Sequence, residues 1–104
     1  MTDLPEAYRR FMDEYPEIGD AYNKLGSAAH EGGPLDQKSR QLLKLALAIG
    51  AGREGAVHSH TRRSLEIDIA SEEIKHVVLL AITTLGFPAA ISAYTWVNDE
   101  LDKP

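Results

Sequence analysis

The hydrophobic positions of this chain recur mostly every three or four residues, which is the period of an amphipathic α-helix. In the first third of the chain this spacing predicts a helix around Pro5–Tyr15. Pro16 stops that helix and can open a second one, which ends at the Gly-Gly-Pro loop of residues 32–34. Proline suits a first helical turn because its missing N–H would have no partner there.

A third helix is predicted after Asp36, a good N-cap residue. Residues 42–49 are apolar except for Lys44, so this helix has little polar surface and is expected to be central. The Gly-Ala-Gly segment of residues 50–52 terminates it.

Three further helices are predicted in the rest of the chain. The fourth covers roughly Arg53–Ile67, and Ser71 is the expected N-cap of a fifth helix that contains the apolar run 77–82. Gly86 stands where a glycine commonly ends a helix, and Pro88 begins the last one. No segment alternates with the period of two that a half-buried strand requires. We therefore predict an all-α fold of about six helices, forming one domain over residues 1–104.

Composition narrows the functional classes. The net charge of −5 argues against a nucleic-acid-binding protein, which would normally carry a basic stripe. No apolar stretch approaches the roughly 20 residues that span a bilayer, so we expect no membrane partner and a cytoplasmic protein. The chain has no cysteine, which excludes disulfides, thiolate catalysis and cysteine-ligated zinc.

Three predicted helices have broad apolar faces, in residues 42–49, 77–82 and 87–97. These faces could cover one another within one chain. A chain of 104 residues has little surface to spare for this, so we expect instead a homo-oligomer.

Groups able to transfer protons are concentrated in residues 53–65, which hold two of the four histidines. At about 100° per residue, a regular helix divides this segment into two faces. One face carries Arg53, Ala56, Val57, His60, Ser64 and Ile67, and the other carries Glu54, His58, Thr61 and Leu65. His58 and His60 should therefore point in different directions.

His60 is the first candidate catalytic residue, because an imidazole beside the small residues Ala56 and Ser64 could move a proton near neutral pH. The alternative is a core histidine satisfied by a backbone carbonyl or by Ser64. Arg53 shares the face of His60 and could hold an anionic substrate, or could simply be a surface residue. Arg53 and Ser64 are thus the candidate substrate-binding residues.

Glu54 and His58 lie four residues apart and could form an auxiliary proton-transfer pair on the same helix, or an exposed ion pair of little consequence. A metal site is a further alternative. His58 and His60 would diverge on a helix, but Glu54 and His58 could supply two ligands and a neighbouring subunit a third. We assign no metal ligand and expect no cofactor.

From residue 34 to residue 101 the chain resembles the carboxymuconolactone decarboxylase / alkylhydroperoxidase D-like family. The resemblance is carried by Leu35-Asp36-x-Lys38-x-Arg40 before an apolar helix, a glycine-containing break, His60 before a run of small residues, Ser71-Glu72-Glu73-Ile74, and Gly86-Phe87-Pro88-Ala89-Ala90. It implies an oligomeric helical fold, a homotrimer or homohexamer, with the site near a subunit boundary.

The peroxidase branch of that family carries a Cys-x-x-Cys pair, a histidine four residues after it and an upstream glutamate. If that histidine is His60, Arg53 and Ala56 replace the cysteines and Gln41 replaces the glutamate. The redox-active thiols are missing, so the resemblance does not imply thiol peroxidase activity here.

The lactone decarboxylase branch needs no thiol, and its histidine also matches His60. Its glutamate would fall near Ala56, which has no acidic group. The resemblance thus implies a histidine-based acid–base enzyme, lyase- or isomerase-like, acting on a small anionic or lactone-like substrate. The alternatives are a non-catalytic oligomeric module and a His/Glu metal-binding protein.

Overall fold

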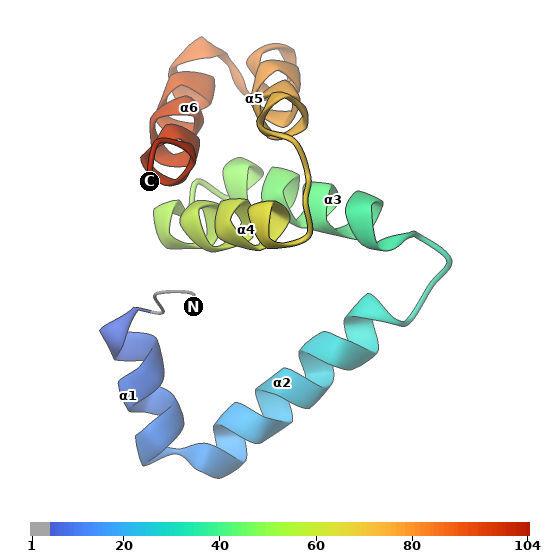
Figure 1. The fold of residues 1–104 in the computed structure, drawn as a ribbon, viewed down its shortest axis with the longest axis vertical. Coiled ribbons are helices and arrows are strands. Elements are labelled where there is room, and N and C mark those ends of the chain that lie inside the picture. Colours follow the sequence, from blue (N-terminus) through green and yellow to red (C-terminus); the bar gives the residue numbers. More distant parts are fainter. Residues whose placement is uncertain (1–4) are drawn as a thin grey trace. The chain divides into compact units, whose positions relative to one another are not determined.

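The computed structural model describes residues 5–104, which form six α-helices and no strand (Figure 1). The all-α prediction is confirmed. The helices are α1 (Glu6–Glu14), α2 (Pro16–His30), α3 (Gln37–Gly50), α4 (Glu54–Glu66), α5 (Ser71–Leu85) and α6 (Phe87–Leu101). None of these helices is both long and apolar enough to cross a membrane.

The chain divides into two compact units, of which the first ends at Leu35. In its described part, α1 and α2 approach closely where Gly19 faces Met12. A Cβ atom at position 19 would lie too close to the Met12 sulfur, so a larger residue there would require the Met12 side chain to move. The aromatic rings of Phe11 and Tyr15 lie 5.3 Å apart, and α2 keeps apolar side chains in solvent, namely Ile18, Tyr22 and Leu25.

The second unit, Asp36–Pro104, contains the hydrophobic core. Helices α3 and α4 lie side by side, as do α5 and α6, and the two pairs pack against each other (Figure 1). The core residues come from all four helices and the loop before α5: Leu45, Ala48, Ile49, Val57, Ile69, Ile74, Val78, Ala81, Ala90, Ala93 and Val97. Helix α4 contacts both α3 and α6, so its side chains can meet partners from two helices.

Local signals explain most helix ends. Asp36 is the N-cap of α3, and its Oδ1 accepts a hydrogen bond from the Ser39 backbone N–H at 2.8 Å. Hydrogen bonds from the Ser39 side chain and backbone hold the pKa of Asp36 below its usual value. Gly86 alone separates α5 from α6, with a φ of 100° that few side chains tolerate.

The predicted cap of α5 is wrong by one residue. Ser71 is already helical, and Ala70 is the N-cap. An alanine side chain cannot accept a hydrogen bond, but the carboxylate of Glu73 accepts one from the Ala70 backbone N–H at 3.1 Å. This contact forms half of a capping box, which satisfies a backbone donor without a polar cap residue.

Candidate functional site

Helix α4 directs its two histidines to different neighbours. Val57, Thr61 and Ser64 are its buried residues and mark the side that faces the core. At about 100° per residue, His60 and His58 flank this buried stripe on opposite sides. His60 meets α3 and His58 meets α6. The expectation that they point apart is therefore confirmed.

His60 is held by Gln41, a buried residue of α3. The Gln41 Nε2 atom lies 3.2 Å from His60 Nδ1 and 3.3 Å from the His60 backbone oxygen. A carbonyl oxygen can only accept, so the amide group that faces it must be the NH₂ group, whose second hydrogen is then directed at Nδ1. A neutral His60 ring consequently carries its proton on Nε2.

The environment of His60 is neither bulk water nor a closed core, because the residue is partly buried. The contact with Gln41 joins two residues 19 positions apart and fixes the ring from one side. Gln41 is the residue that the family resemblance places at the position of the glutamate. An amide therefore contacts His60 where the family has a carboxylate, and an amide cannot accept and release a proton as a carboxylate does.

Ser64 supports the backbone beneath His60. Its side chain is fully buried, and its hydroxyl donates to the His60 backbone oxygen at 2.7 Å. Thr61 makes the same kind of contact, donating to the Val57 backbone oxygen at 2.7 Å. A substrate could reach Ser64 only after rearrangement of the helix packing. This position therefore does not suit the substrate-binding role predicted from the sequence.

Arg53 lies at the start of α4 as its N-cap residue and is exposed. Its backbone N–H donates to the Ala48 backbone oxygen at 3.2 Å, which fixes the turn between α3 and α4. The helical register keeps Arg53 on the side of His60, about 10 Å further along the axis. Its role as an anion-binding residue stays a prediction.

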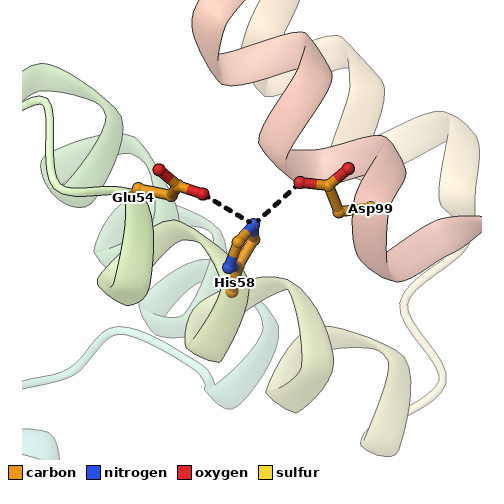
Figure 2. Close-up of side chains that lie close together, drawn as sticks. All are labelled: Glu54, His58 and Asp99. Carbon is orange, nitrogen blue, oxygen red and sulfur yellow. Dashed lines mark hydrogen bonds and ion pairs between the residues drawn. The ribbon is translucent and has the colours of Figure 1, made fainter.

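Glu54, His58 and Asp99 form a second cluster on the other side of α4 (Figure 2). His58 Nε2 lies 3.1 Å from Asp99 Oδ2 and 3.9 Å from Glu54 Oε2. The hydrogen bond of His58 is thus made to Asp99 of α6, while the predicted partner Glu54 lies beyond hydrogen-bond distance. Glu54 remains close enough for an electrostatic interaction with His58.

A buried ion pair joins the same two helices one turn further along. Arg62 Nη1 lies 3.3 Å from Glu100 Oε2, and the Glu100 side chain is only 5% exposed. Lys103 also donates to both carboxylate oxygens of Glu100, at 3.1 Å and 3.2 Å. The Arg62–Glu100 contact helps to fix the register of α4 against α6 and hence the position of Asp99 beside His58.

Among the described residues of the second unit, two hollows lie on the surface of α3, α5 and α6. A groove of about 350 Å³ between α3 and α5 is lined almost entirely by apolar residues, among them Leu47, Leu80 and Leu85. An open hollow of about 570 Å³ is lined by residues of α6 and the segment that follows it, and it includes Asp99. His60 lines neither of these two hollows.

Asp99 was not among the residues singled out from the sequence. It lies in the polar end of α6, in the run Asn98-Asp99-Glu100, where nothing distinguishes it from a solvated acidic residue. Only the packing of α6 on α4 brings it to His58, 41 positions away. The sequence marks Gln41 only as an amide at the position of an acid, and does not indicate that it is the buried partner of His60.

Comparison with known proteins gives a consistent result. The sequence model of the family described as "Carboxymuconolactone decarboxylase family" matches residues 16–99. A solved structure of a carboxymuconolactone decarboxylase family protein from Legionella pneumophila has the same fold, with a TM-score of 0.78 at 24% identity. That similarity covers 90% of this chain and 84% of the Legionella chain.

Two curated relatives add little about chemistry. An uncharacterised protein from Haemophilus influenzae is 32% identical over 63 residues, which are 61% of this chain and 56% of that protein. A protein from Metarhizium robertsii named nitrosuccinic acid decarboxylase is 36% identical over 73 residues, which are 66% of this chain and 51% of the relative. The chain thus matches about half the length of each.

Proposed function

Because the chain belongs to the carboxymuconolactone decarboxylase family, we propose that it is a small lyase that decarboxylates an anionic carboxylic acid. His60 is its proton-transfer residue. The substrate carries an electron-withdrawing group next to the carbon that loses carbon dioxide. The similarity to a protein named nitrosuccinic acid decarboxylase supports this class of reaction. The chain contains no cysteine, so the reaction uses no thiol.

The observation that carries the proposal is the contact between Gln41 and His60. The amide hydrogen directed at Nδ1 selects a ring with its proton on Nε2. A neutral imidazole N–H of this kind can donate a hydrogen bond to an oxygen that gains negative charge.

The chemical step requires only a proton and a stabilised anion. The bond between the substrate carbon and its carboxylate breaks, carbon dioxide leaves, and the electron pair passes to the oxygen of the neighbouring electron-withdrawing group. The Nε2–H of His60 stabilises that oxygen, and a proton from water, transferred through the imidazole, then adds to the carbon.

Arg53 is proposed to hold a second carboxylate of the substrate. It lies on the His60 side of α4, and a guanidinium binds a carboxylate through two parallel hydrogen bonds. The pair Glu54 and His58 turns toward α6, away from His60, so we leave it out of this reaction.

The proposal is tested by measuring carbon dioxide release from small dicarboxylic acids of two kinds. One kind has a keto group on the carbon adjacent to the one that loses its carboxylate, and the other has a nitro group on the carbon that loses its carboxylate. We expect turnover that falls by at least about a hundredfold in His60→Ala. Arg53→Gln is expected to raise KM more than it lowers kcat. His76→Ala, which removes an exposed histidine on α5, should leave activity unchanged. Absence of turnover with folded protein, or full activity in His60→Ala, would reject the proposal.

A second function, that of a non-catalytic assembly module, is favoured by the apolar groove between α3 and α5. Leu47 is 71% exposed and Leu80 61% exposed, which is unusual for large apolar side chains. Such a module would assemble with unchanged stoichiometry in His60→Ala and would turn over none of the substrates tested.

A further inference from the structure

We propose that Glu54, His58 and Asp99 form a binding site for a first-row divalent cation, best matched by Zn²⁺. The site joins α4 to α6 (Figure 2). His60, in contrast, contacts Gln41 of α3 from the other flank of α4. The cation site therefore stands independently of the proposed decarboxylase function.

The three side chains already converge. One nitrogen of His58 and one oxygen from each of Glu54 and Asp99 all lie within 4.8 Å of one another. Zinc binds imidazole nitrogen and carboxylate oxygen at about 2.0–2.2 Å, so ligand atoms in a tetrahedral site are about 3.4 Å apart. Small side-chain rotations of Glu54 and Asp99 would bring the ligand atoms to this spacing, because both side chains are exposed and able to move.

The charges of the cluster favour a cation. The Nε2 atom of His58 carries at most one hydrogen, which is shared with Asp99 at 3.1 Å. Glu54 Oε2, at 3.9 Å, is too distant for a hydrogen bond to that nitrogen. Two neighbouring carboxylates therefore face one imidazole. Even a protonated imidazole offsets only one of their two negative charges, so the cluster keeps a net negative charge. A divalent cation in place of that proton balances both carboxylates.

The packing of α4 on α6 holds the site in position. Val57 and Val97, both fully buried, belong to these two helices. Arg62 follows His58 by one turn and pairs with Glu100, the residue next to Asp99. The His58–Asp99 and Arg62–Glu100 contacts thus form two successive cross-links between the same helices. Asp99 reaches His58 through this register alone, so the ligands are arranged before any cation binds.

The ligand set selects the kind of cation. Imidazole nitrogen suits zinc and neighbouring transition metals, whereas calcium takes six to eight oxygen ligands and magnesium retains most of its waters. Three protein ligands leave at least one coordination position for water or another small ligand, as in catalytic zinc sites. The side chains of Glu54 and Asp99 are exposed, so water can reach that position.

The test is calorimetric titration of the full-length, tag-free protein with ZnCl₂ and, separately, with MgCl₂. We expect one Zn²⁺ bound per chain and no saturable Mg²⁺ binding. His58→Ala and Asp99→Asn should each weaken Zn²⁺ binding by at least about tenfold, with a smaller effect from Glu54→Gln. The controls His76→Ala and Asp102→Asn remove an exposed histidine on α5 and an exposed carboxylate of the same hollow, and should bind as the wild type does.

Co²⁺ provides a second readout that does not depend on stability. The wild-type protein should give the visible absorption of Co²⁺ bound to nitrogen and oxygen ligands, and the absorption should vanish in Asp99→Asn, whose fold is checked by circular dichroism. The proposal is overturned if Zn²⁺ does not bind saturably. It is equally overturned if one-to-one binding persists in His58→Ala and Asp99→Asn, or if His76→Ala weakens binding as much as they do.

Discussion

Gln41 and His60 are joined twice through a single amide nitrogen, at 3.2 Å to the ring and 3.3 Å to the backbone oxygen of the histidine. The contact with the backbone oxygen determines the hydrogen-bonding role of the ring nitrogen. The backbone oxygen requires an N–H₂ donor, and the same group then makes the ring nitrogen an acceptor. One buried residue of α3 thereby fixes both the orientation of the imidazole and the nitrogen that carries its proton.

Replacing Gln41 should therefore change which nitrogen of the His60 ring carries the proton and how much of the ring is protonated. In Gln41→Glu the carboxylate accepts a hydrogen bond, so it favours a ring protonated at Nδ1. We expect long-range ¹H–¹⁵N NMR spectra to show the Nε2–H form in the wild type. In the variant they should show a larger protonated fraction at neutral pH. The matched control Gln41→Leu removes the contact without adding charge and should give a mixture of both neutral forms.

The same variants link this contact to catalysis. Gln41→Leu should lower kcat/KM for decarboxylation by about tenfold or more, because the ring no longer presents one defined tautomer. An unchanged NMR spectrum in both variants would show that Gln41 does not select the proton position.

Much of the fold could be predicted from local signals. The helical periodicity, Asp36 as a cap and Gly86 as a break all act over a few residues, and the six helices follow from them. The error at Ser71 has a local cause as well. Serine is a common N-cap residue, but here the side chain of Glu73 satisfies the Ala70 backbone N–H and the helix begins at Ser71 itself.

The site was predictable only in part, for a different physical reason. Periodicity separates His58 from His60, but it does not say which helix each one meets. The partner Asp99 depends on the packing of α6 against α4, which no local pattern specifies. Helical periodicity predicts Thr61 on the face of His58, but Thr61 is fully buried. Its hydroxyl is satisfied within the helix by the Val57 backbone oxygen, so a polar residue can lie in the core at little cost.

The ion pair between Arg62 and Glu100 should contribute measurably to stability. Arg62→Met keeps much of the side-chain volume but leaves the buried carboxylate of Glu100 with only its contacts to Lys103. We expect a loss of about 2–3 kcal/mol in the free energy of unfolding, measured by urea denaturation. Arg63→Met is the matched control on an exposed neighbour and should change stability by less than about 0.5 kcal/mol. Equal stabilities of the two variants would contradict this role.

The ion pair between Lys38 of α3 and Glu73 of α5 should make the stability of the folded protein depend on pH. The hydrogen bond from Lys38, together with a smaller contribution from the Ala70 backbone, holds the pKa of Glu73 below its usual value. A carboxyl group whose pKa is lower in the folded state than in the unfolded state stabilises the protein at any pH above its unfolded-state pKa. This contribution is lost as the pH falls through the folded-state pKa.

The wild type should therefore melt at a higher temperature than Glu73→Gln at neutral pH. The difference should shrink as the pH falls below about 4.5. Glu72→Gln removes the same charge from the adjacent exposed position and should show a smaller pH-dependent difference. A melting-temperature difference that stays constant from neutral to acidic pH would exclude the ion pair as its cause.

The groove between α3 and α5 leads to a prediction about assembly. Leu47 and Leu80 expose most of their side chains there, on helices whose opposite sides form the core. Burial of one such leucine stabilises an interface by about 2 kcal/mol, whereas a buried, unpaired glutamate opposes association strongly. The wild type should therefore self-associate in size-exclusion chromatography with light scattering, as the homotrimer or homohexamer that the family resemblance implies. Leu80→Glu should shift the protein toward monomer. Leu65→Glu, at an exposed position of α4 outside the groove, is the control and should leave the mass unchanged. A monomeric wild type, or dissociation by Leu65→Glu but not by Leu80→Glu, would show that the groove does not bind a second copy of the chain.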